Sequence, residues 1–125
     1  MIIKRWSSSG RGRSSCVALD GMVWTVANAM DMTANFESQV AQSFAMLDMH
    51  LTEALSARTH MLSLQVILAD ITTLDAFAPL WQEWIGPDPA HWPQRACYQA
   101  VLTPGLLVEL VATAAPASTR LLHIQ

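Results

Sequence analysis

The chain has 125 residues, which fits one domain with one hydrophobic core, and 52% of them are hydrophobic while only 14% are charged. This hydrophobic fraction is higher than the core of a lone monomer needs, so we expect some of the hydrophobic residues to lie in a subunit interface. The alternative is that the seven methionines fill gaps in the core. A formal charge of −3 with only seven basic residues argues against a surface that follows nucleic-acid phosphates. We expect a single domain over residues 1–125 that does not bind nucleic acid.

The sequence also bears on location and on metals. Residues 2–6 run directly into a serine-rich stretch, unlike a secretion signal, and no window holds the roughly 18 apolar residues of a membrane span. Cys16 and Cys97 are far apart and fit reduced thiols. The histidines have no Cys or acidic partners at metal-ligand spacing (His50, His60, His91 and His123). We expect a cytoplasmic protein with no membrane segment, no metal and no cofactor.

The first predicted elements are strands. Residues 2–6 favour a strand, and residues 7–15 form a polar loop whose Gly-Arg pairs have an RNA-binding arm as their alternative interpretation. The apolar segments 16–19 and 22–26 flank Asp20-Gly21, two residues that tolerate the positive φ of a type I′ turn. The pattern predicts a β-hairpin here.

Two helices and a strand follow. Apolar side chains at spacings of three and four predict a helix over residues 35–56, capped by Thr33 or Asn35. Residues 60–70 predict an interior strand. A second helix is predicted over 74–85, with Thr72-Thr73 as its cap, Pro79 in its first turns and Gly86-Pro87 at its end.

The C-terminal part predicts two further strands, 95–102 and 106–114, joined as a closing hairpin by the turn at 103–105. The tail from Pro116 is either disordered or docked through Leu121-Leu122. Two helices can cover only one face of such a sheet. We therefore expect an α+β fold whose other face packs against another subunit.

The two closing strands carry the chain's most unusual charges. Between Ala90 and Thr119 the only charged residues are Arg95 and Glu109, each in an apolar or neutral strand. One interpretation is structural, with the two forming a buried ion pair or with Arg95 reaching water at a strand end. The other is functional: an arginine fork binds a substrate carboxylate, and a nearby carboxylate orients a water molecule or accepts its proton.

Other candidate residues have simpler explanations. Cys97 has no adjacent histidine and is more simply a small strand residue than a nucleophile. Trp81 and Trp84 fall on the apolar face of the second helix and are expected in the core. The sequence contains no glycine-rich phosphate loop, nucleophile elbow or zinc signature.

The same closing region resembles the RidA/YjgF family, whose members include L-PSP endoribonuclease-like proteins. Residues 93–97 (PQRAC) and 103–110 (TPGLLVEL) match its Pro-x-Arg signature, Pro-containing turn and Val-Glu-Leu strand. Residues 66–70 (VILAD) and 81–85 (WQEWI) are similar to the YoaB-like branch. The similarity runs over residues 3–115, with specific motifs only in its second half.

The resemblance implies a chorismate-mutase-like subunit that forms homotrimers with pockets between neighbouring subunits. It implies hydrolysis of reactive 2-imino or enamino acids to 2-oxo acids and ammonia. In that activity Arg95 would hold the substrate carboxylate and Glu109 the hydrolytic water, after a turn one residue shorter than usual. Cys97 matches a position whose backbone lines the pocket.

Three departures from the family pattern affect the predicted pocket. Thr25-Val26 replaces a Ser/Thr-Gly pair, Ala78 replaces an asparagine, and Arg13 stands where deaminases often have an aromatic residue. Thr25, Val26 and Arg13 complete the candidate substrate site, but the three departures also leave open a non-catalytic protein that senses small carboxylates. A ribonuclease or translation inhibitor, as described for some members, is disfavoured by the pI of about 5.7.

Overall fold

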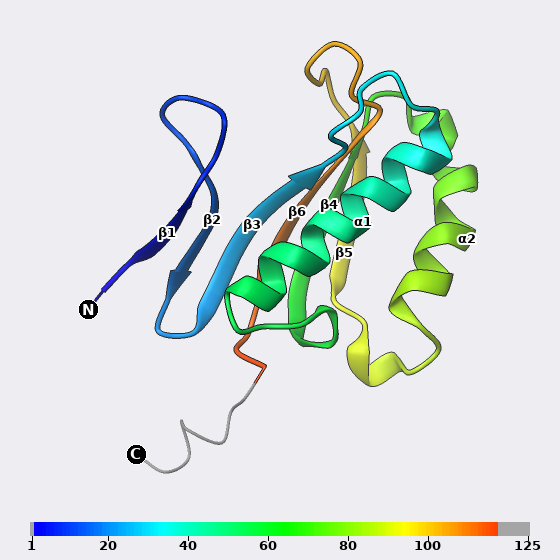
Figure 1. The fold of residues 1–125 in the computed structure, drawn as a ribbon. Helices are drawn as coiled ribbons and strands as arrows, with labels where there is room; N and C mark the ends of the chain where they lie inside the picture. Colours follow the sequence, from blue (N-terminus) through cyan, green and yellow to red (C-terminus); the bar gives the residue numbers. More distant parts are fainter. Residues whose placement is uncertain (1, 118–125) are drawn as a thin grey trace.

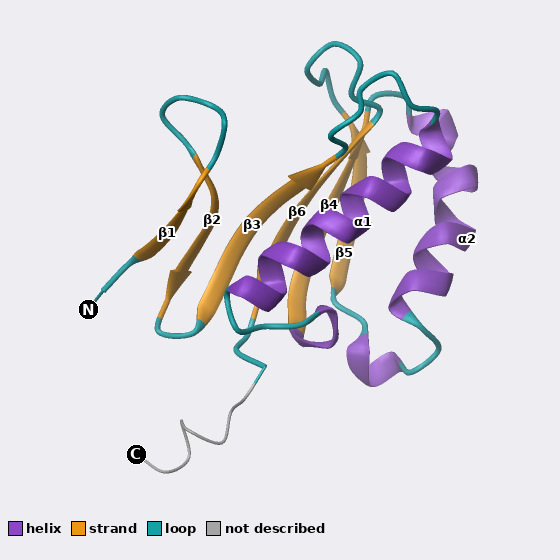
Figure 2. Ribbon diagram, viewed as in Figure 1, coloured by secondary structure: helices purple, strands orange, loops and turns teal. Residues whose placement is uncertain are grey.

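The structure is a computed structural model that describes residues 2–117. It contains six strands and two α-helices, with three short 3₁₀ turns between them (Figures 1 and 2). The strands are β1 (Lys4–Ser7), β2 (Ser14–Leu19), β3 (Met22–Asn28), β4 (Met61–Leu68), β5 (Gln94–Gln99) and β6 (Val108–Ala114). The helices are α1 (Phe36–Glu53) and α2 (Leu74–Ile85).

All six strands belong to one sheet in the order β1-β2-β3-β6-β4-β5. Only β4 and β5 pair in parallel, because α2 connects them as a crossover, and the other pairs are antiparallel. Both helices pack on the same face (Figure 1). The expected α+β fold, a mixed sheet with two helices on one face, is therefore confirmed.

The predicted first hairpin is confirmed. Asp20 and Gly21 connect β2 to β3 with φ values of 51° and 82°, the left-handed conformation that a type I′ turn requires at both positions. The third strand extends to Asn28, two residues beyond the predicted segment, because β6 pairs with it from Val23 to Asn28, where Asn28 lies opposite Glu109.

Helix α1 begins where the sequence predicts and ends slightly earlier. The Asn35 side chain accepts a hydrogen bond from the Ser38 amide at 2.9 Å, so Asn35 and not Thr33 is the cap. The helix ends at Glu53 because Leu55 adopts a left-handed φ of 62°. Its buried face packs on β3 and β6 and forms much of the core, through Val40, Phe44, Leu47 and Leu51.

Helix α2 has the predicted bounds, but the capping prediction is wrong. The Thr73 side chain makes no capping bond, and Asp70 instead accepts a hydrogen bond from the Thr72 amide at 2.9 Å at the start of a 3₁₀ turn that precedes the helix. Gly86 ends the helix at a φ of 82°. Pro79 lies inside α2.

The predicted closing hairpin is also wrong. Strands β5 and β6 follow each other in sequence, but β4 lies between them in the sheet. The crossover through α2 places β5 at the outer edge beside β4, and the chain then returns to insert β6 between β3 and β4. The prediction failed because a proline-containing turn between two apolar segments has the same composition whether it joins neighbouring strands or returns across a third.

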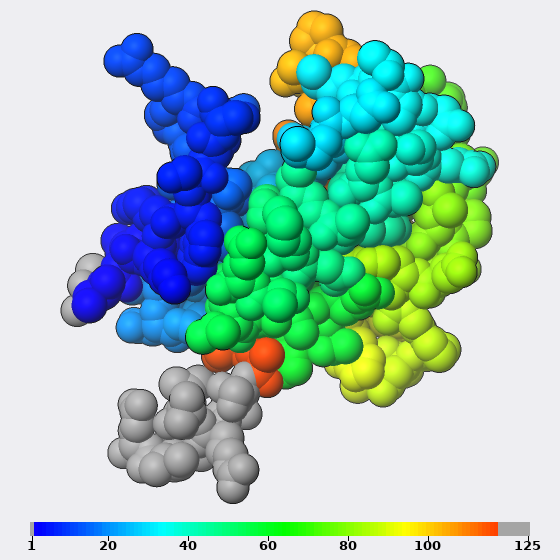
Figure 3. Space-filling view, in the orientation of Figure 1, coloured from blue at the N-terminus to red at the C-terminus, as the bar shows by residue number. Residues whose placement is uncertain are grey.

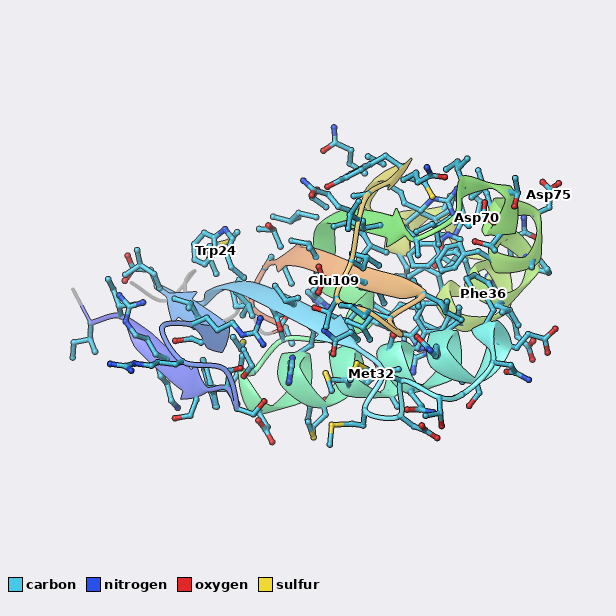
Figure 4. All side chains as sticks on the ribbon, turned by 90° about the horizontal axis from the view of Figure 1, so that it is seen from above. Trp24, Met32, Phe36, Asp70, Asp75 and Glu109 are labelled. Atoms are coloured by element: carbon cyan, nitrogen blue, oxygen red, sulfur yellow. The ribbon has the colours of Figure 1, made fainter. Side chains whose placement is uncertain are left out.

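The face of the sheet opposite the helices is partly apolar, and neither α1 nor α2 lies over it. Trp24 and Val26 of β3 and Tyr98 of β5 are 43%, 39% and 42% exposed. In Figure 4, Trp24 and Glu109 lie on the side of the sheet away from α1. We call this surface the open face.

Two further expectations concern the C-terminal tail and membrane-spanning segments. The tail prediction for residues 116–125 lies, from residue 118 onward, outside the described residues. Within residues 2–117, neither helix combines the length and hydropathy that crossing a bilayer requires.

Candidate functional site

Arg95 lies near the start of the edge strand β5 and points to the side of the sheet that carries the helices. Its pairing partner on β4 is Leu64, which is fully buried beneath the helices, and paired residues project to the same face. The guanidinium carbon lies 5.6 Å from the ring centroid of Trp81 and 5.9 Å from that of Phe77. Cation–π attraction to these two rings of α2 orients the side chain.

A cavity of about 740 Å³ opens beside Arg95. It lies between α2 and the segment that leads into β5, and its walls include Ala78, Trp81, Ile85, Pro87, Trp92 and Arg95. A largely apolar cavity of this size with one guanidinium is suited to a small organic acid. Among residues 2–117, no carboxylate lies within ion-pair distance of Arg95, which leaves the guanidinium able to bind an anion.

Glu109 lies on the open face, near the start of β6. It pairs with Asn28 on β3 and with Ile67 on β4. Its neighbours along β6, Val108 and Leu110, point into the core. The Asn28 side-chain amide donates a hydrogen bond to Glu109 Oε1 at 3.3 Å. The carboxylate is partly exposed, and this bond holds one oxygen while the other remains available to a water molecule.

Arg95 and Glu109 therefore do not meet within one chain. They lie on opposite faces of the sheet, on β5 and β6, with β4 between them. This arrangement contradicts the structural alternative of an ion pair between the two. It also means that one described chain cannot by itself bring both groups to a single substrate.

Cys97 follows Arg95 by two residues, so it lies on the same face, partly buried against the core. Burial raises the pKa of its thiol, and the positive charge of Arg95 only partly opposes this effect. The thiol is thus protonated at neutral pH. This is consistent with a residue that packs in a strand and not with an activated nucleophile.

Thr25 and Val26, predicted beside the substrate, point in opposite directions. Val26 is on the open face, in the same row of β3 side chains as Asn28. Thr25 is 3% exposed beneath α1, where its hydroxyl donates to the Ser15 carbonyl at 3.0 Å and lies 2.8 Å from His50 Nδ1. The structure assigns the Thr25 side chain to the interior, and only Val26 offers a side chain to a ligand on the open face.

The Thr25–His50 contact makes stability depend on pH. Because the Thr25 hydrogen is used by Ser15, the threonine oxygen accepts from His50 Nδ1–H, and burial lowers the pKa of the imidazole. The unfolded chain then binds a proton that the folded chain excludes, so folding free energy is lost as pH falls through about 6.5. We expect the urea midpoint to fall between pH 7.5 and 5.5, and to fall less in His50→Asn, which keeps an N–H donor. Equal pH dependence in both proteins would contradict this assignment.

Arg13 lies on the loop between β1 and β2, at the end of the sheet farthest from β5. This hairpin projects away from the body of the molecule (Figure 3). The Arg13 side chain folds back over Gly10, where an added Cβ would clash with Arg13 Nε. Within one chain Arg13 is therefore remote from the Arg95 cavity.

Sequence reasoning missed two residues at these positions. Asn28 holds Glu109, and its place at the end of β3 directly opposite the glutamate becomes visible only once the register is known. Trp92 forms a wall of the Arg95 cavity, and its sequence signal was its proximity to the Pro-x-Arg motif. No cluster of three potential metal-ligating side chains occurs in the described part of the chain.

Comparison with known proteins agrees with this fold and these motifs. The family model Endoribonuclease L-PSP matches residues 3–116. An uncharacterized protein from Pseudomonas aeruginosa is 26% identical with a TM-score of 0.83, the alignment covering 92% of this chain and 99% of that one. A member of the YjgF protein family from Neisseria meningitidis is 24% identical with a TM-score of 0.81, covering 94% and 98% of the two chains.

A third similar structure, a protein of the conserved Rid family from Yersinia pestis, is 16% identical with a TM-score of 0.79, covering 89% of this chain and 93% of that one. None of the curated proteins matches the chain. The similarity to the YoaB-like branch stays a prediction. The family model, which spans nearly the whole chain, shows that this protein belongs to the endoribonuclease L-PSP family, also known as the RidA/YjgF family.

Proposed function

We propose that this protein hydrolyses 2-imino acids to 2-oxo acids and ammonia, with Arg95 holding the substrate carboxylate. The observation that carries the proposal is a guanidinium without an acidic partner in the described residues, held over two aromatic rings at the wall of a largely apolar cavity. A carboxylate bound bidentately there would gain a charge-assisted contact. Family membership supports the general role.

We propose further that Glu109 acts from a neighbouring copy of the chain. Because Arg95 and Glu109 lie on opposite faces, a second copy must bring its open face to the β5 edge of the first for the two groups to meet. The exposed apolar side chains of the open face, such as Trp24 and Val26, support an interface there. A cyclic homotrimer, as the family resemblance implies, would form three equivalent sites.

The chemistry requires only water as the second reactant. Glu109 accepts a proton from a water molecule as the water oxygen adds to C2 of the imine. The C=N π pair becomes a lone pair on nitrogen, which takes that proton from Glu109. The resulting carbinolamine loses ammonia as the C–N bond breaks and the C=O bond forms. In this step Glu109 transfers the hydroxyl proton to the leaving nitrogen. An enamino acid enters the same route after it tautomerises to the imine.

The proposal is tested by generating imines in the presence of the protein. An amino acid oxidase, with catalase to remove peroxide, supplies 2-imino acids, and the release of 2-oxo acid is compared with the spontaneous rate. We expect clear acceleration at catalytic protein concentrations. No acceleration for any imino acid would reject the hydrolase.

The alternative is a non-catalytic protein that binds small carboxylates at the same site. The departures at Val26 and Ala78 favour it, because they remove features of the deaminating members from the predicted pocket. It predicts a thermal shift with 2-oxo acids that requires Arg95, without acceleration of imine hydrolysis. The two assays together separate the two functions.

A further inference from the structure

The walls of the Arg95 cavity are dominated by apolar and aromatic side chains. Besides Arg95 they include two indoles, Trp81 and Trp92, together with Ile85, Pro87 and Pro93. At about 740 Å³, the cavity is much larger than a three-carbon acid needs. The space next to the guanidinium is therefore able to hold the side chain of the acid as well as its carboxylate.

The aromatic walls are fixed before any ligand arrives. The Trp92 indole N–H donates to the Gly86 carbonyl at 2.9 Å, which ties the side chain to the end of α2 although 54% of the residue is exposed. The preceding 3₁₀ turn is capped by Asp88, whose side chain accepts from the Ala90 amide at 3.0 Å. Trp81 is 8% exposed and packs against Phe77 and Phe44. A preorganised wall loses little entropy when an apolar group binds to it.

The charges around the cavity restrict the ligand further. Arg95 is its one cationic lining residue in the described structure, and Glu83, an exposed carboxylate of α2, lies on the same wall. One carboxylate of the ligand pairs with Arg95, whereas a second one on an acidic side chain would meet Glu83. The cavity thus fits a monocarboxylate with an uncharged side chain.

Ala78 contributes the space at the helix wall. Its side chain is a single methyl group, so at this point of the wall the residue adds neither bulk nor a polar group. A small apolar residue at this position leaves the neighbouring indole rings accessible to a ligand.

From these observations we propose that the cavity is a side-chain pocket that selects 2-imino acids with bulky apolar or aromatic side chains over small or acidic ones. The inference rests on the proposed function, since it names the substrate class of that same site. Stacking and apolar burial against Trp81 and Trp92 would supply the selectivity.

The test compares imines that differ only in side chain. D-amino acid oxidase acting on D-alanine or D-phenylalanine supplies a small and an aromatic imine. Each rate of hydrolysis with the protein is divided by the spontaneous hydrolysis rate of the same imine. We expect the acceleration to be about tenfold or more greater for the phenylalanine imine, as for loss or gain of apolar contacts in a pocket. Equal acceleration, or a preference for the alanine imine, would overturn the pocket while leaving the hydrolase intact.

Two variants and a control locate the selectivity. Trp92→Ala should lower the preference for the phenylalanine imine about tenfold, and Trp92→Phe should restore most of it. Ala78→Leu should narrow the pocket and reduce the same preference. Met49→Ala, an exposed apolar residue of α1 outside the cavity, is the matched control. A preference that survives both Trp92→Ala and Ala78→Leu would contradict the assignment.

If no imine is hydrolysed, binding still decides the matter. Calorimetry with phenylpyruvate and pyruvate measures the same preference without turnover, and circular dichroism verifies that each variant is folded. Tighter binding of phenylpyruvate that is lost in Trp92→Ala would support the pocket although the hydrolase had failed. Equal affinities, or no binding of phenylpyruvate, would reject the pocket.

Discussion

Arg95→Ala and Glu109→Gln are each expected to remove most of the imine hydrolysis. Loss of a charge-assisted bidentate contact costs about 1.5–3 kcal/mol, or roughly 10- to 150-fold in kcat/KM. Loss of a positioned general base costs about 10²- to 10⁴-fold. Rates of 2-oxo acid release from purified variants measure both effects. Thermal unfolding of each variant controls for damage to the fold.

The two inactive variants are expected to rescue each other. If the site takes Arg95 from one copy and Glu109 from the next around a cyclic assembly, co-expression at equal amounts restores about a quarter of the sites. The reason is that about half of the subunits carry an intact arginine and half an intact glutamate, distributed at random. Mixed assemblies are isolated through two different affinity tags and assayed at equal protein concentration.

A second mixture separates the two geometries independently. Co-expression of the wild type with the Arg95→Ala/Glu109→Gln double variant leaves about a quarter of the sites intact if they are shared between copies, but about half if each lies within one chain. A site inside one chain would also give no rescue in the first mixture. Half of the sites intact in this mixture, or no rescue in the first mixture, would refute the shared site that the opposite faces of Arg95 and Glu109 require.

Much of the fold was predictable from local sequence signals. The Asp20-Gly21 turn, the periodicity of α1 and the Gly86 end of α2 each depend on residues close in sequence, and all three are confirmed. Arg95 and Glu109 were predicted as candidate site residues because two lone charges in apolar strands are costly unless they have a role. Their role at a substrate site stays a prediction.

Their arrangement was not predictable in the same way. The sequence predicts a hairpin of β5 and β6, which are neighbours along the chain, yet long-range pairing inserts β4 between them. The face of the sheet to which each side chain points could not be predicted either, because it depends on the register of strand pairing. Thr25 illustrates this: one position away from Val26, it is buried against His50 and not exposed on the open face.

Phe77→Ala is expected to be among the most destabilising substitutions in the chain and to weaken the site as well. Phe77 is fully buried, with ring centroids 6.0 Å from Phe44 and 6.4 Å from Trp81. Removing a buried phenylalanine costs about 3–5 kcal/mol, a large share of the roughly 5–15 kcal/mol that stabilises a domain. Urea unfolding measures the loss.

The Phe77 ring also lies beneath the Arg95 guanidinium, so it has a second role besides packing in the core. A second variant separates the two roles. Phe77→Leu keeps an apolar side chain of similar volume and should cost about 1.5 kcal/mol or less if the core repacks. It removes the aromatic face, however, so Arg95 loses part of the cation–π attraction that orients it. We expect this variant to remain folded and to bind 2-oxo acids more weakly than the wild type. Unchanged binding in Phe77→Leu would mean that Trp81 alone orients the arginine, and a loss below about 1 kcal/mol in Phe77→Ala would contradict the central position of this ring in the core.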